Sequence, residues 1–476
     1  ESPGSPAASI VNMSAQTSLV RGLSSFVVAS PTPYHMCVRA ASKLTEAGFT
    51  EIKETDPWAE KSMLKPGGKY FYTRAASTIV AFAIGAAFEA GNGFKVIGAH
   101  TDSPVLKVKP ISKKSAHGYM QVGVECYGGG LWHTWFDRDL SLAGALIVEK
   151  DGGGFDRKLV HIQRPLLRVP NLCIHLQTAD ERSKFEVNKE NHLVPILAMM
   201  DKELNKTAEG EGGCDERHAS ELVRLLAAEA GCRPEQIKDC DLTLCDTQPG
   251  QVWGAKEEFF SSPRLDNQVS CFMGLEALVE HAADLSADSD VSVLCCFDHE
   301  EVGSDSTHGA GSPIMQEVVE RVNTCFGVAP GGEKFKLSLQ KSFVVSSDVA
   351  HAIHPNYASK HEANHGPLLN KGTVIKLNSN QRYATSATTG FFIRELSRKA
   401  GVGCQEFVVR NDCPCGSTIG PKIAALTGIR TVDVGISSLS MHSIRETVGC
   451  ADVELSTKLF VEFYKSFREL DNSCSF

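Results

Sequence analysis

Three features are missing from this 476-residue sequence, and each absence argues against a class of protein. No apolar run approaches the ~20 residues that a membrane-spanning helix requires, so no membrane partner is expected. There is no long basic tract and the formal net charge is −9, which argues against a nucleic-acid partner, because phosphate binding needs a basic face. Residues 1–16 lack the basic start and apolar stretch of a secretory signal.

Cysteine pairs at metal-binding spacing are also scarce, although the chain contains 16 cysteines. Cys413 and Cys415 stand together in the sequence CPC, but no second pair accompanies them at the spacing of a zinc site. Other cysteines lie in apolar strings such as LCCF and NLCIH, where the side chain behaves as a small buried hydrophobe. Reduced thiols without a disulfide framework predict a cytoplasmic protein.

The length and the order of the secondary-structure signals predict two domains, one inserted into the other. Helices and strands alternate in residues 18–104 and again in 259–476, which indicates an α/β fold with helices on both faces of a sheet. Residues 105–258, rich in glycine and β-forming residues, predict a β-rich insertion. Residues 1–17 are expected to be a disordered lead-in, and residues 201–220 a loop or a disordered insertion.

Individual elements follow from the spacing of apolar residues and from start and stop signals. The α/β part predicts helices at residues 30–48, 266–285, 312–326, 387–401 and 451–467, and strands near residues 94–100, 291–297, 342–348 and 431–437. The insertion has strand candidates at residues 122–132, 144–150, 158–169 and 171–177. The three glycines at 128–130 are interpreted either as a hinge or as a close backbone approach.

Polar, ionisable side chains follow the carboxyl ends of several predicted strands. In an open α/β sheet this edge is where ligands bind, so residues far apart in the sequence can meet there. A turn-forming or solvated role is the simpler interpretation of any single residue, including the acidic stretch DHEE at 298–301. The candidates are His100, Asp102, Asp266, Glu300, Glu301, Asp348, His351 and His442.

Five of these candidates, taken together, are a ligand supply for two divalent ions. They comprise two imidazoles and three carboxylates, which suffice if one carboxylate bridges two ions ~3.5–4 Å apart. Mixed ligation of this kind suits zinc, and Mn²⁺ or Co²⁺ would also be accepted. The five are His100, Asp266, Glu301, Asp348 and His442.

Two further carboxylates have predicted roles beside the ions. Glu300 and Glu301 are adjacent, so we expect one to bind metal and the other to handle protons, although spacing alone leaves open which does which. Asp102 lies two residues after His100 and is placed to hydrogen-bond that imidazole.

Ten motifs in order along the chain resemble the M18 metallopeptidases of the aspartyl aminopeptidase type. They are IGAHTDSP, GGGLWHTWFDRDLSLAG, HLVPILA, DTQPG, SPRLDN, DHEEVGS, SSDVAHAIHPNY, NQRYATS, RNDCPCGSTIGP and MHSIRE. The resemblance implies a zinc-peptidase-like mixed sheet, with an inserted dimerisation domain at residues 105–258 and assembly into a homododecamer built from dimers. It also implies two Zn²⁺ per subunit and removal of N-terminal Asp or Glu from peptides.

Site residues carried over by motif follow from the same resemblance. It assigns His100, Asp266 and Glu301 to one zinc, and Asp266, Asp348 and His442 to the other, so that Asp266 bridges. Glu300 corresponds to the general base, with Asp102 beside the metal ligand. The substrate-binding positions are His175 from a neighbouring subunit, Glu300, Asp348, His351, Lys376 and Tyr383. One departure is His299, where the family usually has Asn.

Two alternative functions stay open on the sequence. A related two-zinc hydrolase, such as a broad aminopeptidase or an amide deacylase, would use the same donors on other substrates. A catalytically silent scaffold or cargo particle would use the oligomer without the site. The intact set of donors argues against decay of the site, although it does not demonstrate turnover.

Overall fold

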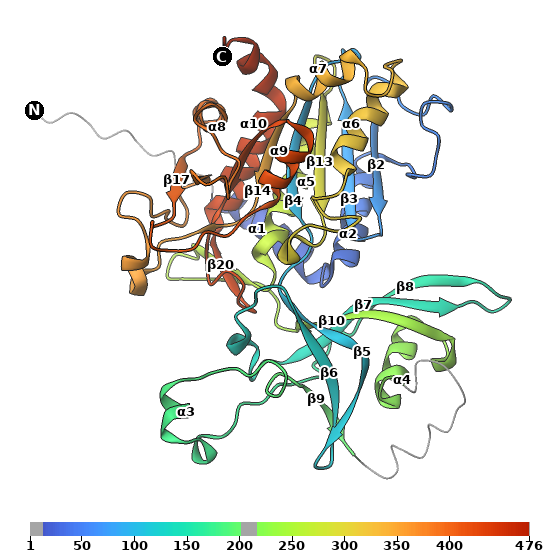
Figure 1. The fold of residues 1–476 in the computed structure, drawn as a ribbon, viewed down its shortest axis with the longest axis vertical. Coiled ribbons are helices and arrows are strands. Elements are labelled where there is room, and N and C mark those ends of the chain that lie inside the picture. The colour runs from blue at the N-terminus through green and yellow to red at the C-terminus, as the bar shows by residue number, and fades with distance from the viewer. Residues whose placement is uncertain (1–12, 201–216, 476) are drawn as a thin grey trace, which may run out of the picture.

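The computed structural model describes residues 13–200 and 217–475. A nine-stranded mixed sheet forms the larger part, and a six-stranded sheet lies below it in Figure 1. The predicted α/β fold with a β-rich insertion is therefore confirmed. Within the described ranges, no helix is both long and apolar enough to cross a membrane, and no disulfide links the cysteines.

The nine-stranded sheet brings four parallel strands together at its centre, β13, β4, β14 and β18, so their carboxyl ends share one edge. β3 and β16 flank them in the antiparallel sense. The strand order is β1 (Thr50–Glu51), β2 (Lys69–Arg74), β3 (Thr78–Ile84), β13 (Val291–Phe297), β4 (Phe94–His100), β14 (Phe343–Ser347), β18 (Arg430–Gly435), β16 (Thr373–Leu377) and β17 (Cys404–Val408).

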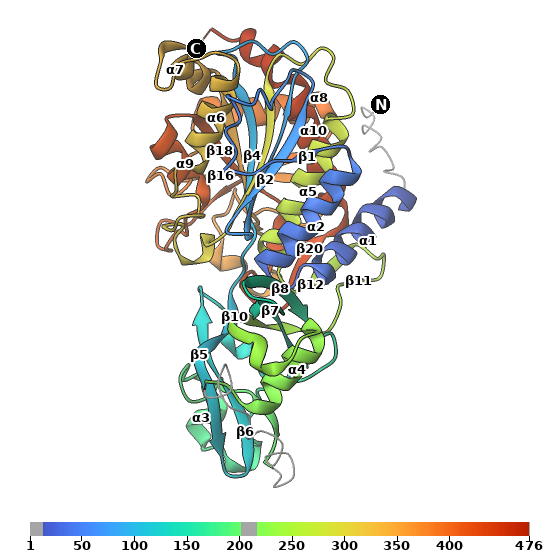
Figure 2. The same ribbon diagram turned by 90° about the vertical axis from the view of Figure 1, so that its right-hand side faces the viewer.

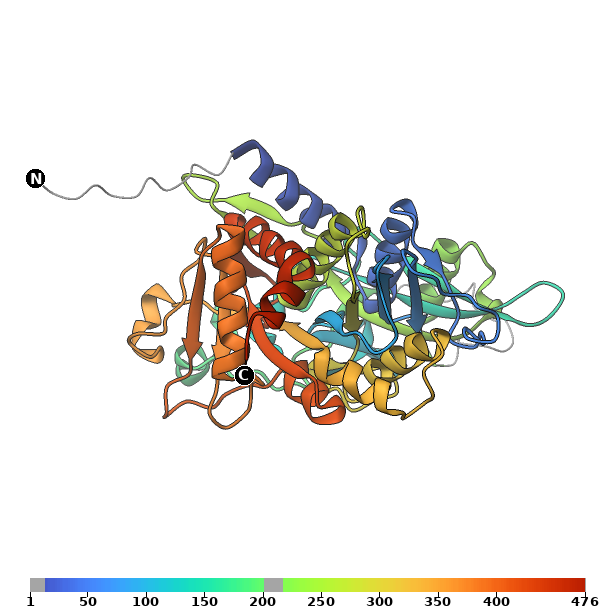
Figure 3. The same ribbon diagram turned by 90° about the horizontal axis from the view of Figure 1, so that it is seen from above.

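Helices cover both faces of this sheet, as Figure 2 shows from the side and Figure 3 from above. Each face has its own apolar core, in which the buried residues of the strands meet those of the helices. One layer contains α1 (Met13–Ala29), α2 (Pro33–Glu46), α5 (Leu265–His281), α8 (Ala387–Ala400) and α10 (Cys450–Asn472). The other contains α6 (Ile314–Cys325), α7 (Glu333–Lys341) and α9 (Ile419–Thr427).

The inserted region is an antiparallel sheet with one covered face. The helix α4 (Ser220–Ala230) packs its buried residues into the core of this sheet, and a short helix, α3 (Ala179–Ser183), lies in a long exposed loop. The strand order is β8 (Phe155–His161), β7 (Leu140–Glu149), β10 (Ile237–Asp246), β5 (Val105–Ala116), β6 (Tyr119–Tyr127) and β9 (Ile196–Met199).

A third, five-stranded sheet joins segments of the larger part near the edge of the main sheet. Its order is β11 (Gln251–Trp253), β12 (Phe259–Ser262), β20 (Glu446–Gly449), β19 (Ser437–Leu439) and β15 (Ala350–His351). β11 falls inside the expected insertion 105–258, yet it pairs with β12 and so belongs to the larger part. The inserted sheet itself ends at β10.

Local sequence explains where the helices begin and end. Thr32 caps α2 by accepting from the backbone N–H of His35, and Pro33 occupies the first turn, where no N–H is needed. Gly401 ends α8 in the left-handed conformation. Capping of this kind made the boundaries of these helices readable from the sequence.

Two local predictions were wrong. A helix, α1, begins at Met13, inside the range 1–17 expected to be a disordered lead-in, while residues 1–12 lie outside the described residues. Residues 171–177 were expected to form a strand, but they contain the exposed 3₁₀ turn η2 (Ile174–Leu176). An apolar run makes a strand only where a neighbouring strand can pair with it. The loop predicted at residues 201–220 lies mostly outside the described residues, and α4 begins at its last position.

Candidate metal centre

The candidate ligands meet at the carboxyl edge of the parallel strands. His100 is the last residue of β4, Asp348 directly follows β14, and Asp266 lies at the start of α5. Glu301 lies in the 3₁₀ turn η5 (Glu300–Val302), which follows β13. His442 follows β19 in a turn with a backbone φ of 65°, a sparsely populated conformation that is enriched at functional sites.

Asp266 lies between the two histidines. Its Oδ1 is 3.1 Å from Nε2 of His100, and its Oδ2 is 3.4 Å from Nε2 of His442. Asp348 Oδ1 lies 3.5 Å from the same nitrogen of His100, whereas Glu301 Oε2 lies 3.5 Å from Nε2 of His442. His100, Asp266 and Glu301 also offer donor atoms within 4.8 Å of one another. The shortest contacts, however, group Asp348 with His100 and Glu301 with His442.

Several oxygens of this cluster are buried without a well-formed hydrogen bond from any described residue. They are Asp266 Oδ1, Glu301 Oε1 and Asp348 Oδ1. A buried carboxylate oxygen without a donor is costly, and a cation that it coordinates would offset that cost. The residues present therefore fit a metal ion.

The electrostatics of the cluster lead to the same conclusion. Burial, followed by the charge of Asp266, raises the pKa of Glu301 well above its usual value. Burial alone would lower the pKa of His442, but Asp266 and Glu301 raise it to about 10. Burial opposes the charge of His100 too, yet the surrounding carboxylates raise its pKa. The site has a strongly negative potential, which favours divalent cations.

Asp102 lies behind His100 and fixes both the histidine and the adjacent glutamates. Its Oδ1 is 3.3 Å from His100 Nδ1 and accepts from the backbone N–H of Glu300. Its Oδ2 accepts from the backbone N–H of Glu301 at 3.0 Å and from the hydroxyl of Tyr127 at 2.7 Å. Burial alone would raise the pKa of Asp102, but His100 and these donors hold it below its usual value. A single carboxylate thereby contacts four neighbours and orients them.

Sequence reasoning missed Glu446, which ties two candidate ligands together. Its side chain is 1% exposed and accepts from the backbone N–H of Asp266 and of His442, both at 2.7 Å. Burial and the charge of Asp266 raise the pKa of Glu446 to about 8. Glu446 ends the motif MHSIRE, so its position beside His442 was the available signal. Its other partner, Asp266, lies 180 residues away in the sequence, and no local pattern indicates that contact.

The glycines at 128–130 make a close approach to the metal centre. The carbonyl of Gly129 lies 3.0 Å from Nδ1 of His442, which leaves Nε2 directed at the cluster. A Cβ added at Gly128 would lie 3.1 Å from Cβ of Glu301, and its φ of 73° also favours glycine. The structure therefore favours the close-approach interpretation. These residues belong to the insertion, so the inserted region contributes to the site.

Two of the predicted substrate residues are buried beside the cluster. Lys376, on β16, is 2% exposed, and its Nζ lies 3.3 Å from Oδ2 of Asp348. The same ammonium lies 5.4 Å from the ring centre of Tyr383, which is 4% exposed. Desolvation, with smaller contributions from nearby groups, raises the pKa of Tyr383 above its usual range. Both side chains flank the Asp348 end of the centre.

Two more of the predicted substrate residues, His351 and His175, lie at the surface. His351, on β15, is exposed and lines an open groove that reaches His442. His175 lies on the exposed turn η2, and no contact among the described residues joins it to the cluster of its own subunit. The groove offers an approach for an extended ligand, whereas His175 faces outward.

Comparison with known proteins places the chain in a family. The family described as "Aminopeptidase I zinc metalloprotease (M18)" matches residues 26–464. A relative from Ricinus communis, named "Probable aspartyl aminopeptidase", is 45% identical over 97% of this chain and 99% of its own length. The "Aspartyl aminopeptidase" of Aspergillus oryzae is 48% identical over 93% of this chain and 95% of its own.

Solved structures agree with the family match. The "Cryo-EM structure of the Ape4 and Nbr1 complex" superimposes with a TM-score of 0.93 at 45% identity, covering 97% of this chain and 88% of that one. The "Structure of S. cerevesiae mApe1 dodecamer" gives a TM-score of 0.83 at 30% identity, covering 96% and 98%. The chain belongs to the M18 family of zinc metalloproteases and is an aminopeptidase-type hydrolase.

Proposed function

We propose that the protein removes an acidic N-terminal residue, Asp or Glu, from peptides and does so with a two-zinc centre. The bridging position of Asp266 carries the proposal, because its two oxygens face two different imidazoles, 3.1 Å from His100 and 3.4 Å from His442. The names of the relatives, aspartyl aminopeptidases, support the substrate class. The open groove beside His442 supports a peptide ligand.

The two ions have different ligand sets in this proposal from those that the resemblance implied. One ion takes His100, Asp266 and Asp348, and the other takes His442, Asp266 and Glu301. The contacts of 3.5 Å between His100 and Asp348, and between His442 and Glu301, support this grouping. Asp266 bridges in both assignments, so the exchange concerns only Asp348 and Glu301.

Glu300 is the general base in the proposed mechanism. Zinc bound at the centre supplies Lewis-acid polarisation of the scissile carbonyl and lowers the pKa of water. Glu300 Oε2 lies 3.9 Å from Nε2 of His100, and burial, despite the opposing charge of His100, raises the pKa of Glu300 to about 8. A carboxylate at this position accepts the proton of the attacking water and then donates it to the leaving amine. Asp102 holds the backbone of Glu300 while this happens.

Lys376 supplies a cation for the acidic side chain of the substrate. A buried ammonium is costly unless it is paired, and Asp348, at 3.3 Å, now pairs with it. Coordination of Asp348 to zinc would leave the ammonium available to a second carboxylate. We expect Lys376→Ala to reduce kcat/KM for Asp-terminal peptides more than for Leu-terminal peptides, measured side by side. An equal loss on both would assign Lys376 to the support of Asp348 instead.

The proposal also includes an oligomeric state and a cellular location. Homododecamers built from dimers are proposed because a solved relative at 30% identity is described as a dodecamer. In such an assembly the exposed His175 of one subunit would reach the site of its neighbour and stabilise the tetrahedral oxyanion. A cytoplasmic location stays a prediction from the cysteine pattern.

A matched pair of adjacent glutamates tests the proposal. Glu300→Gln removes the base, so kcat should fall by ~10²–10⁴-fold while zinc content is retained. Glu301→Gln removes a ligand and should lower zinc content itself. Zinc per subunit and kinetics on an Asp-terminal peptide are measured on both variants. Loss of zinc from Glu300→Gln, with zinc retained in Glu301→Gln, would reverse the two roles.

A further inference from the structure

A second group of metal-type donors lies outside the centre described above. Asp298 directly follows β13, His299 precedes η5, and His308 lies in the loop before α6. One ligand atom from each lies within 4.8 Å of the other two. None of the three takes part in the proposed two-zinc chemistry, so their convergence needs a separate explanation.

The distances suit a single ion. Asp298 Oδ2 lies 3.6 Å from Nε2 of His299 and 3.6 Å from Nε2 of His308. The two imidazole rings lie with their centroids 4.4 Å apart and their planes tilted by 48°. Donors at about 2.0–2.2 Å from a tetrahedral zinc ion lie ~3.4 Å from one another, and both Oδ2–Nε2 distances are within tenths of an ångström of that separation.

Both imidazoles are held by their far nitrogens. Nδ1 of His299 is 2.8 Å from the hydroxyl of Ser306, and Nδ1 of His308 is 2.9 Å from that of Thr307. Ser306 Oγ also accepts from the backbone N–H of Gly309. Histidines that bind metal usually donate the other ring N–H to a partner of this kind, which leaves the second nitrogen as the ligand. Both Nε2 atoms are thereby directed at Asp298.

The carboxylate is held equally well. Asp298 is 6% exposed, and its Oδ1 accepts from the backbone N–H of His299 at 2.8 Å, which leaves Oδ2 for the imidazoles. The backbone N–H of Asp298 donates to the hydroxyl of Thr78, which itself donates to the carbonyl of His308. The strand end and the loop before α6 are therefore joined around the three donors.

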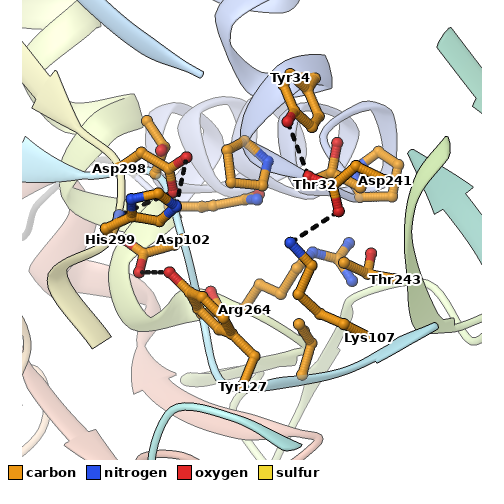
Figure 4. A pocket seen from close by; sticks show the side chains of 16 residues that line it. Thr32, Tyr34, Asp102, Lys107, Tyr127, Asp241, Thr243, Arg264, Asp298 and His299 are labelled. Carbon is orange, nitrogen blue, oxygen red and sulfur yellow. Dashed lines mark hydrogen bonds and ion pairs between the residues drawn. The ribbon is translucent and has the colours of Figure 1, made fainter. Parts of the chain in front are cut away.

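An ion can reach this group from a cavity that the catalytic groove does not share. Asp298 and His299 line a small pocket between the larger part and the insertion, together with Asp102 and Tyr127 (Figure 4). The cavity supplies room for water at the remaining coordination positions. Two neutral imidazoles and one carboxylate leave a divalent ion with a single net positive charge, and this ligand set suits zinc-type transition ions.

We propose that Asp298, His299 and His308 form a third site for a divalent transition ion of the zinc type. The ion would link the end of β13 to the loop before α6. Asp298 and His299 precede Glu300 and Glu301 in the chain, and His308 follows them, so the ion would anchor this short segment at both ends. Its ligands are separate from the five of the two-zinc centre. The proposal therefore stands whether or not the assignment of the catalytic ions holds.

Zinc content at a buffered, nanomolar free-zinc concentration tests the site. His299→Asn combined with His308→Gln removes two ligands and should lower zinc by one equivalent per subunit relative to the wild type. The matched control is His117→Asn, because His117 is exposed and, like His299, has a positive φ that asparagine tolerates. The control should keep the full content. Since the readout is the difference between variants, an error in the number of catalytic ions does not affect it.

Equal zinc content in the double variant and the wild type would overturn the proposal. If the double variant fails to fold, or loses more than one equivalent, the wild-type protein decides the question. Crystals soaked in zinc should show an anomalous peak between Asp298 Oδ2 and the two Nε2 atoms. A map with anomalous peaks elsewhere, or nowhere, and none at this position would refute the third site.

Discussion

The two large sheets of the molecule bury their side chains differently. In the nine-stranded sheet, β3, β4, β13 and β14 are buried at every residue, because helices cover both faces. In the inserted sheet, β5 mixes buried with exposed positions, and only one residue of β8 is buried. Parallel strands need cover on both faces, whereas an antiparallel sheet can leave one face to water.

The difference suggests that the larger part buries its apolar surface by itself, whereas the insertion relies on another protein to bury part of its own. The larger part already has an apolar core on each face, as a complete folding unit would. The insertion has one apolar core and carries the three most exposed large apolar side chains of the described residues, which is typical of a surface that another protein covers. They include Ile111 at 69% exposed, Phe155 at 63%, Ile174 at 59%, Leu176 at 70% and Met199 at 58%.

The same truncation in both sheets measures this contrast most directly. Phe82 in β3 is 0% exposed, so Phe82→Ala should cost about 3–5 kcal/mol of unfolding free energy through lost burial and a cavity. Phe155 in β8 is 63% exposed, and Phe155→Ala should stay within about 0.5 kcal/mol. Urea unfolding of both variants gives the two values. A large cost for Phe155→Ala would mean that the assembly buries this strand.

The exposed turn η2 allows a test of the interface role of the insertion. Ile174→Ser combined with Leu176→Ser removes two exposed apolar side chains, each worth about 1.5–3 kcal/mol if an interface buries it fully. We expect particle mass, measured by light scattering, to fall toward smaller assemblies while the subunit remains folded. Activity should fall with it, because His175 lies between the two changed residues.

The control for this change lies in the larger part. Leu337 on α7 is 45% exposed, and Leu337→Ser should leave both particle mass and activity unchanged. If the η2 variant also kept its full mass, the apolar turn would not be an interface. The contrast between a self-sufficient larger part and an insertion that needs a partner would then lose its main support.

The contrast also explains what the sequence could predict. Continuous apolar strands ended by polar residues, as in β4 and β13, identify both the parallel sheet and its ligand edge, so His100 and Glu301 were found together. In the insertion, residues 171–177 have the apolar composition of a strand but no partner. Strand pairing is a property of distant segments, and composition does not encode it.

The site shows the same limit. Donor types at strand ends indicated which residues meet, because the sheet topology brings those ends together. They did not indicate which carboxylate lies beside which imidazole, since the placement of Asp348 and Glu301 depends on side-chain directions. Glu446 was missed because its two partners, Asp266 and His442, are joined only in the folded chain.

The smallest expected effect concerns the boundary between the two regions, where His35 of α2 faces His161 of β8. The ring centroids are 6.0 Å apart. Burial, together with the charges of its partner and of Arg264, lowers the pKa of His35 to about 4, and burial with Arg264 lowers that of His161 to about 4. Their pKa in the unfolded chain is about 6.5.

Between pH 6.5 and 4 the unfolded chain therefore binds more protons than the folded protein, so stability is full above about pH 6.5 and falls as the pH drops toward 4. Because the pair lies at a partly exposed boundary, we expect on the order of 1 kcal/mol between pH 7 and pH 5. His35→Gln combined with His161→Gln should flatten the profile of urea midpoints over this window, whereas the exposed His117→Asn should not. Parallel profiles for the double variant and the wild type would show that protonation of this pair does not weaken the junction. A flattened profile would show that protonation of these two imidazoles destabilises the boundary between the larger part and the insertion. The nine-stranded sheet, which is covered on both faces, would not contribute to this effect.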